Sequence, residues 1–120
     1  MKRLLITLIL VSPLSFADWG DVYYCQETSF AMTSPNGKLR EGELEKFQFK
    51  LDKTKNAMVF GSSGTLKEEV IQLRKGSKKG GEWWFAENNM DRVSFSDGEF
   101  LYTLTSPSTA FMMSAECDKF

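Results

Sequence analysis

The sequence predicts an all-β domain, an antiparallel meander of about eight strands that forms a small closed or nearly closed barrel. Three observations support this fold class. Apolar and polar residues alternate with a period of two along most of the chain, short polar turns separate these stretches, and no segment has the pattern of a long helix. A two-layer β-sandwich is the alternative, because the same set of short strands fits either architecture.

The clearest element is a β-hairpin over residues 91–105. Its Asp-Gly turn at positions 97 and 98 can adopt the two positive φ angles of a type I′ turn. With this turn, Phe95 faces Phe100 and Val93 faces Tyr102, so one face of the hairpin is apolar and the other is polar. We therefore expect a sheet with a core on one side and water on the other.

The other strands are expected at residues 21–32, 46–52, 57–60, 69–74, 82–87 and 109–118. The first of these alternates imperfectly, which indicates a β-bulge or a change of face within the strand. Residues 38–45 are charged and are interrupted by Gly42, so they fit either an extended loop or one poor helical turn.

Residues 1–17 are expected to be a cleaved signal peptide. Lys2 and Arg3 give a positive start, residues 4–11 are apolar, and small residues lead to a cleavage point after Ala17. The apolar run has about half of the roughly 20 residues that a membrane-spanning helix needs. We expect an exported, periplasmic or secreted protein whose mature part, residues 18–120, is a single β domain without a transmembrane segment.

The chain has two cysteines, Cys25 near the start of the mature domain and Cys117 near its end. In an exported protein the default expectation is that they form a structural disulfide. Such a bond would make the first and last strands neighbours, which favours closure of the sheet into a barrel.

The composition excludes several functional classes. Without Lys2 and Arg3 the mature chain has 13 basic and 16 acidic residues, a balance that argues against nucleic acid as a partner. The chain has no histidine, so Ser-His-Asp and Cys-His nucleophiles are impossible and zinc would lack its usual nitrogen ligand. We expect no catalytic activity, no metal and no cofactor, and a monomeric domain that binds an unknown protein or small ligand.

Two neighbouring features could form a binding surface. The first is a glycine-rich basic segment, residues 74–81, whose positive charges are Arg74, Lys75, Lys78 and Lys79. The second is the Trp83-Trp84 pair that follows it. Because adjacent residues of a strand point to opposite faces, one of these tryptophans should be exposed, and exposed tryptophans are common anchors in interfaces.

A Ser-Gly pair at 63–64, a Lys-Gly pair at 75–76, Tyr23-x-Cys25 and the late Cys117 are similar to features of the MliC-type lysozyme inhibitors, although the tyrosine that follows Ser-Gly in that family is missing. The resemblance implies an exported inhibitor of a cell-wall hydrolase whose two loops enter the lysozyme cleft. It would require a lysine of the basic segment to project into an acidic enzyme cleft.

Three functional hypotheses follow. The leading one is an exported, non-enzymatic binding domain that acts through the basic segment and the exposed tryptophan. The second is the inhibitor implied by the resemblance. The third is a structural component of a cell envelope or particle, which would present an unpaired sheet edge.

Overall fold

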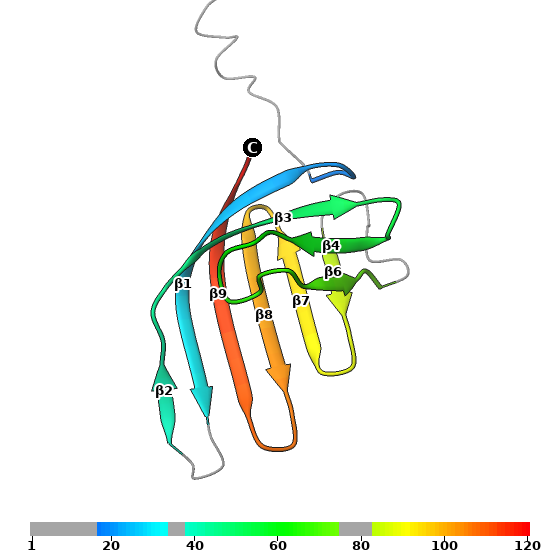
Figure 1. Cartoon of the computed structure of the whole chain (residues 1–120). Helices are drawn as coiled ribbons and strands as arrows, with labels where there is room; N and C mark the ends of the chain where they lie inside the picture. The colour runs from blue at the N-terminus through cyan, green and yellow to red at the C-terminus, as the bar shows by residue number, and fades with distance from the viewer. Residues whose placement is uncertain (1–16, 34–37, 75–82) are drawn as a thin grey trace, which may run out of the picture.

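The computed structural model describes residues 17–33, 38–74 and 83–120, so the predicted signal peptide lies almost entirely outside the described residues. The described part is all-β, and its strands pair in antiparallel fashion (Figure 1). No helix in this part is long and apolar enough to span a membrane. The strands are β1 Val22–Thr33, β2 Leu39–Glu41, β3 Lys46–Asp52, β4 Ala57–Phe60, β5 Val70–Gln72, β6 Trp84–Glu87, β7 Asp91–Ser96, β8 Glu99–Thr105 and β9 Ala110–Lys119.

Eight of these strands form an antiparallel meander that is nearly closed into a barrel. Their order in the sheet is β5-β4-β3-β1-β9-β8-β7-β6, which is the order of the chain around a ring that opens between β5 and β6. The short strand β2 lies outside this ring and pairs with the far end of β1 (Figure 1). The predicted barrel is confirmed, and the segment 38–45 is extended rather than helical.

Among the described residues, a few contacts bridge the opening between β5 and β6. Leu73 and Ala86 form an isolated β-bridge, and the Arg74 backbone N–H donates to the Phe85 carbonyl oxygen at 2.9 Å. Further along, the Asn88 side chain accepts from the backbone N–H of Gln72 at 3.5 Å and donates to the carbonyl oxygen of Val70 at 3.4 Å. An amide side chain thus continues the ladder where the backbone of β6 has already ended.

The irregularity predicted in the first strand is a β-bulge. The register between β1 and β9 shifts between Glu27 and Ser29, so Thr28 is the extra residue. Before the shift the alternate residues up to Glu27 face the barrel interior. After it, Phe30 takes the inward position, lies opposite Met113 and packs its ring against Phe111, with the ring centroids 4.6 Å apart.

Glu27 is a buried carboxylate whose two oxygens each accept a hydrogen bond. The backbone N–H of Glu45 donates to Oε1 at 3.0 Å, and the hydroxyl of Thr65 donates to Oε2 at 2.8 Å. A buried carboxylate is costly unless it is satisfied in this way. Glu27 therefore ties the connections before β3 and before β5 to the middle of β1.

The β7–β8 hairpin has the predicted register, with Phe95 opposite Phe100 and Val93 opposite Tyr102. Asp97 and Gly98 have φ angles of 51° and 79°, the positive pair that the two-residue turn requires. Glycine is needed at position 98 for a second reason, because an added Cβ would lie 3.0 Å from the carbonyl oxygen of Cys117.

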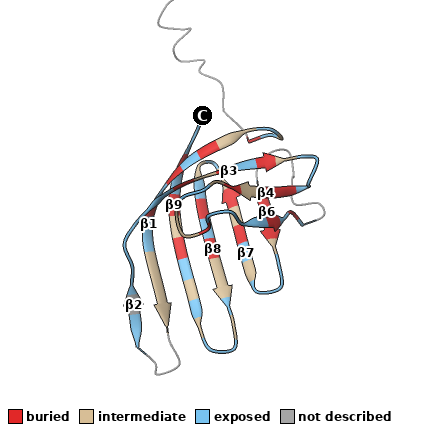
Figure 2. Ribbon diagram, viewed as in Figure 1, coloured by how far each residue is buried: buried red, intermediate tan, exposed pale blue. Residues whose placement is uncertain are grey.

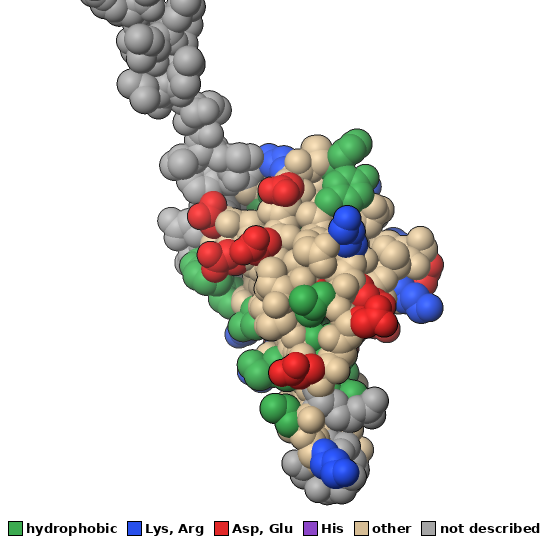
Figure 3. Space-filling model, turned by 90° about the vertical axis from the view of Figure 1, so that its left-hand side faces the viewer, with side chains coloured by type: hydrophobic (Ala, Val, Ile, Leu, Met, Phe, Trp, Pro, Cys, Tyr) green, Lys and Arg blue, Asp and Glu red, His purple; other side chains and the backbone are tan. Residues whose placement is uncertain are grey.

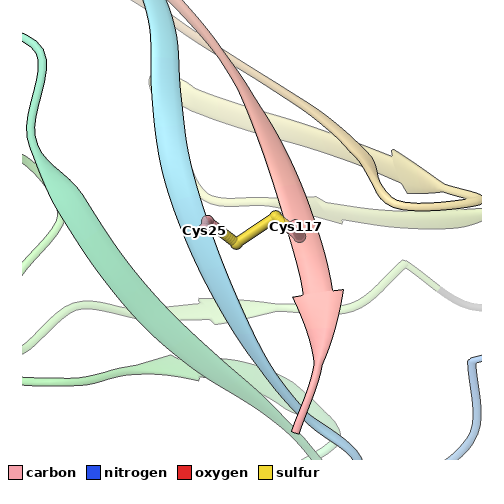
Figure 4. Close-up of a disulfide and its surroundings, with 2 residues drawn as sticks. All are labelled: Cys25 and Cys117. Carbon is pink, nitrogen blue, oxygen red and sulfur yellow. A yellow bond between two sulfur atoms is a disulfide. The ribbon is translucent and has the colours of Figure 1, made fainter.

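Aromatic side chains fill the barrel interior. Phe49 is at the centre of this core, where its ring contacts Tyr23, Phe60, Phe95 and Phe100 at centroid distances between 5.1 and 5.6 Å. Figure 2 shows the buried positions recurring along the strands between more exposed ones, as the period of two predicts. The disulfide between Cys25 and Cys117 is present and joins β1 to β9 (Figure 4).

Two core tyrosines predict a loss of stability at alkaline pH. Burial, together with the charge of Asp21, raises the pKa of Tyr23 from its ordinary value of 10 to about 12. Burial and the 2.8 Å hydrogen bond that Tyr102 donates to Asp91 also raise the pKa of Tyr102. Because both folded pKa values exceed the unfolded ones, the folded state favours the protonated phenols.

This stabilisation is complete below pH 10 and is lost as the pH rises through the pKa of Tyr23 near 12. We expect the free energy of unfolding in urea to fall over this window. The variant Tyr23→Phe should show a smaller fall, since it removes one of the two ionising groups. An identical pH profile in the variant would contradict the assignment of Tyr23.

Candidate functional site

The two adjacent tryptophans lie on opposite sides of the sheet, as the alternation of strand residues predicts. Trp84 is 0% exposed and sits in the core, where its ring meets Trp19 edge-on at 5.0 Å. Trp83 is 49% exposed and lies outside the barrel. Of the two tryptophans proposed for a binding surface, Trp83 is therefore the exposed one, while the pairing of Trp84 with Phe95 places the Trp84 side chain on the inner face.

Trp83 belongs to a small stack of planar groups on the outer face. Its ring lies parallel to that of Phe85, at an interplanar angle of 10° and a centroid distance of 5.9 Å. The Arg74 guanidinium lies 5.9 Å from the centroid of the Phe85 ring, a cation–π arrangement. We call Arg74, Trp83 and Phe85 the Trp83 surface.

Ion pairs hold one end of this surface. Arg74 Nε lies 3.5 Å from a carboxylate oxygen of Glu87, and Arg92 Nε lies 3.4 Å from the other. These pairs are solvent-exposed and contribute little to stability. The Arg74 guanidinium thus lies between the Glu87 carboxylate and the Phe85 ring.

Arg74 is the one predicted basic residue of this segment that lies within the described part of the chain. Lys75, Lys78 and Lys79 lie outside the described residues, so only their position in the sequence between Arg74 and Trp83 is established. The structure thus brings Arg74 and Trp83 into one surface and adds Phe85, which the sequence reasoning did not select.

A shallow groove of about 380 Å³ begins at Trp83 and crosses the outer face of β7, β8 and β9. Its principal outward side chains are those of Trp83, Ser94, Leu101, Ser114, Glu99 and Glu116. Sequence reasoning missed this groove because its residues come from separate strands. Only the register, which places Ser94 beside Leu101 and Leu101 beside Ser114, brings them together.

One side of the molecule has a surface of mixed character. On the side of the molecule seen in Figure 3, acidic, basic and small hydrophobic groups are interspersed. Within the described ranges, no group of three or more cysteine, aspartate or glutamate side chains has the geometry to hold a metal ion.

The fold and this site define a class: a small antiparallel β-barrel, linked end to end by a disulfide, with an exposed aromatic surface beside a groove. No protein family, curated protein or solved structure matches this chain.

Proposed function

We propose that this protein is an exported, non-enzymatic binding domain whose recognition surface is the Trp83 surface together with the adjoining basic segment. The observation that carries the proposal is the half-exposed Trp83 ring, which is stacked on Phe85. Large, rigid aromatic rings gain contact area at a small cost in conformational entropy, and they dominate the energetics of many interfaces. The positive charges of residues 74–79 would add attraction to an acidic partner.

Export is supported by two features. The first residues have the composition of a cleaved signal peptide, and the Cys25–Cys117 disulfide suits an oxidising compartment. A non-enzymatic role is supported by the residue inventory, since a chain without histidine lacks the commonest general base. We further propose that the mature domain is a monomer in the periplasm or outside the cell.

The lysozyme-inhibitor alternative requires a different arrangement of contacts. Gly64, with a φ angle of 87°, packs against the backbone of β3, and its loop connects β4 to β5. The basic segment begins at Arg74, beyond the other end of β5. In the chain, the Ser-Gly pair therefore precedes β5 and the Lys-Gly pair follows it, and the Lys-Gly pair lies outside the described residues.

A structural role in an envelope or particle is supported by the edge of the sheet. Within the described residues, β2 pairs only with β1, and its Leu39 side chain is 67% exposed. Unpaired edges can add strands from another chain. Self-association of the mature domain, measured by size-exclusion chromatography over a range of concentrations, would favour this alternative over a monomeric binding domain.

The proposal is tested by affinity capture with the oxidised mature domain, residues 18–120, from the cell-envelope and secreted fractions of the source cells. We expect Trp83→Ala to weaken capture of a specific partner about tenfold or more, as the loss of an interface anchor does. Changing Lys75, Lys78 and Lys79 to Glu should also weaken it. The matched control is Phe120→Ala, which removes an 84% exposed aromatic ring outside the Trp83 surface. If all variants capture the same partners as the wild type, the proposal is wrong.

A further inference from the structure

The groove beside Trp83 has an acidic end. Strand pairing places Glu99 of β8 directly opposite Glu116 of β9, and both side chains are exposed on the outer face. Like charges in this position repel each other and destabilise the sheet. A cation bound between the two carboxylates would relieve this repulsion.

Among the described residues, no side chain that lines the groove brings a positive charge to this pair. Among the described residues, neither glutamate takes part in an ion pair, and the groove lining contains no lysine or arginine. Gln26, which lies opposite Glu116 on β1, directs its amide N–H groups to the carbonyl oxygens of Glu27 and Glu45. The two carboxylates remain available to an incoming partner.

The other walls of the groove also suit an organic cation. The Trp83 ring borders it, and aromatic faces attract ammonium and guanidinium groups. Leu101 provides an apolar floor for a methylene chain. The hydroxyl of Ser114 lies 2.9 Å from that of Thr28 and 2.6 Å from that of Ser29, and hydroxyl oxygens can accept further hydrogen bonds from a cation.

The open shape of the groove distinguishes between possible cations. Sites for free small molecules usually enclose most of the ligand, whereas this groove lies on an open sheet face. A basic side chain that belongs to a larger partner needs no such enclosure, because the rest of the partner can contact the Trp83 surface.

We propose that the groove between Trp83 and the Glu99–Glu116 pair binds a lysine or arginine side chain of an extended basic segment in a protein partner. This inference rests on the proposed function and deepens it: the partner would present acidic groups to the basic segment of residues 74–79 and one basic side chain to the Glu99–Glu116 end of the groove. The carboxylates hold the charged group, the indole ring flanks it, and Leu101 packs against its methylene chain.

The test is an NMR titration of the ¹⁵N-labelled, oxidised mature domain. The probes are a short, flexible peptide with two lysines among glycines and serines, and the same peptide with both lysines acetylated. We expect the lysine peptide to shift the amide signals of Ser94, Leu101 and Ser114 and the indole signal of Trp83. The acetylated peptide should not shift them, because it carries no side-chain charge.

Charge-matched variants complete the test. Changing Glu99 and Glu116 together to Gln should weaken binding of the lysine peptide about tenfold, because two exposed charge contacts are lost. Changing Glu41 and Glu43 together to Gln removes the same charge elsewhere on the surface and should leave the affinity unchanged. Equal weakening by both double variants, or equal binding of the acetylated peptide, would overturn the inference.

The two proposals fail in different ways. If Trp83→Ala abolishes capture of the natural partner but the Glu99/Glu116 double variant does not, the binding surface stands and the cationic partner is wrong. If neither change affects capture, both proposals are wrong. A neutral glycan that shifts the same groove signals and is unaffected by the double variant would also overturn the choice of a basic side chain.

Discussion

Replacing Cys25 and Cys117 together by alanine is expected to destabilise the β domain, residues 18–120, by about 4 to 5 kcal/mol. The two residues are 92 positions apart, so their bond restricts nearly the whole β domain in the unfolded state. Domains of this size have a total stability of only about 5 to 15 kcal/mol. The loss would therefore remove much of the margin that keeps the barrel folded.

Urea unfolding of the wild type and the double variant, followed by tryptophan fluorescence, measures this effect. The wild type in the presence of a reductant should behave like the variant, which controls for the substitutions themselves. If the oxidised wild type and the variant unfold at the same urea concentration, the disulfide does not stabilise the barrel and this expectation is wrong.

Changing Trp84 to alanine is expected to destabilise the domain by about 3 to 5 kcal/mol, because the substitution opens a cavity in a packed core. The expectation depends on the complete burial of the Trp84 side chain and its edge-on contact with Trp19. The neighbouring change Trp83→Ala should cost no more than about 1 kcal/mol, since the side chain is half-exposed and loses mainly its stacking on Phe85.

The two variants therefore separate stability from recognition. We expect Trp84→Ala to shift the unfolding transition strongly, and Trp83→Ala to retain the fold while it loses partner capture. Parallel urea titrations compare the free energy of unfolding of the two variants. Similar destabilisation by both, or a larger loss for Trp83→Ala, would contradict the assignment of Trp84 to the core and Trp83 to the surface.

Local sequence pattern was sufficient for most of the fold. The alternation in residues 46–52 predicted β3 with its observed bounds, and the Asp-Gly turn fixed the register of the β7–β8 hairpin. The imperfect alternation of the first strand indicated a bulge or a change of face, and the register between β1 and β9 shows a bulge at Thr28. The expected disulfide predicted the closure of the barrel, because it required the first and last strands to be neighbours.

Elements that depend on distant partners were harder to predict. The strand β2 is charged and is followed by Gly42, so its own sequence does not favour a strand, and its conformation comes from pairing with β1. Gly42 also lies against the Phe30 ring, where an added Cβ would approach to 2.9 Å. The side chain of Asn88 helps to bridge the opening between β5 and β6, and no local sequence pattern indicates this role.

The candidate site was predicted in part for the same reason. The alternation of side chains showed that Trp83 and Trp84 must face opposite sides, but it did not show which one faces the core. That choice depends on the pairing of Trp84 with Phe95 across β6 and β7. The facing glutamates of the groove depend in the same way on the pairing of β8 with β9.

The most direct test of the Trp83 surface is hydroxyl-radical footprinting of the captured complex, read out by mass spectrometry. The oxidation rate of Trp83 should fall strongly when the partner binds, while those of Leu39 on β2 and Phe120 at the end of the chain should stay at their free values. An unchanged rate at Trp83, together with protection of Leu39, would place the interface on the sheet edge and contradict the account.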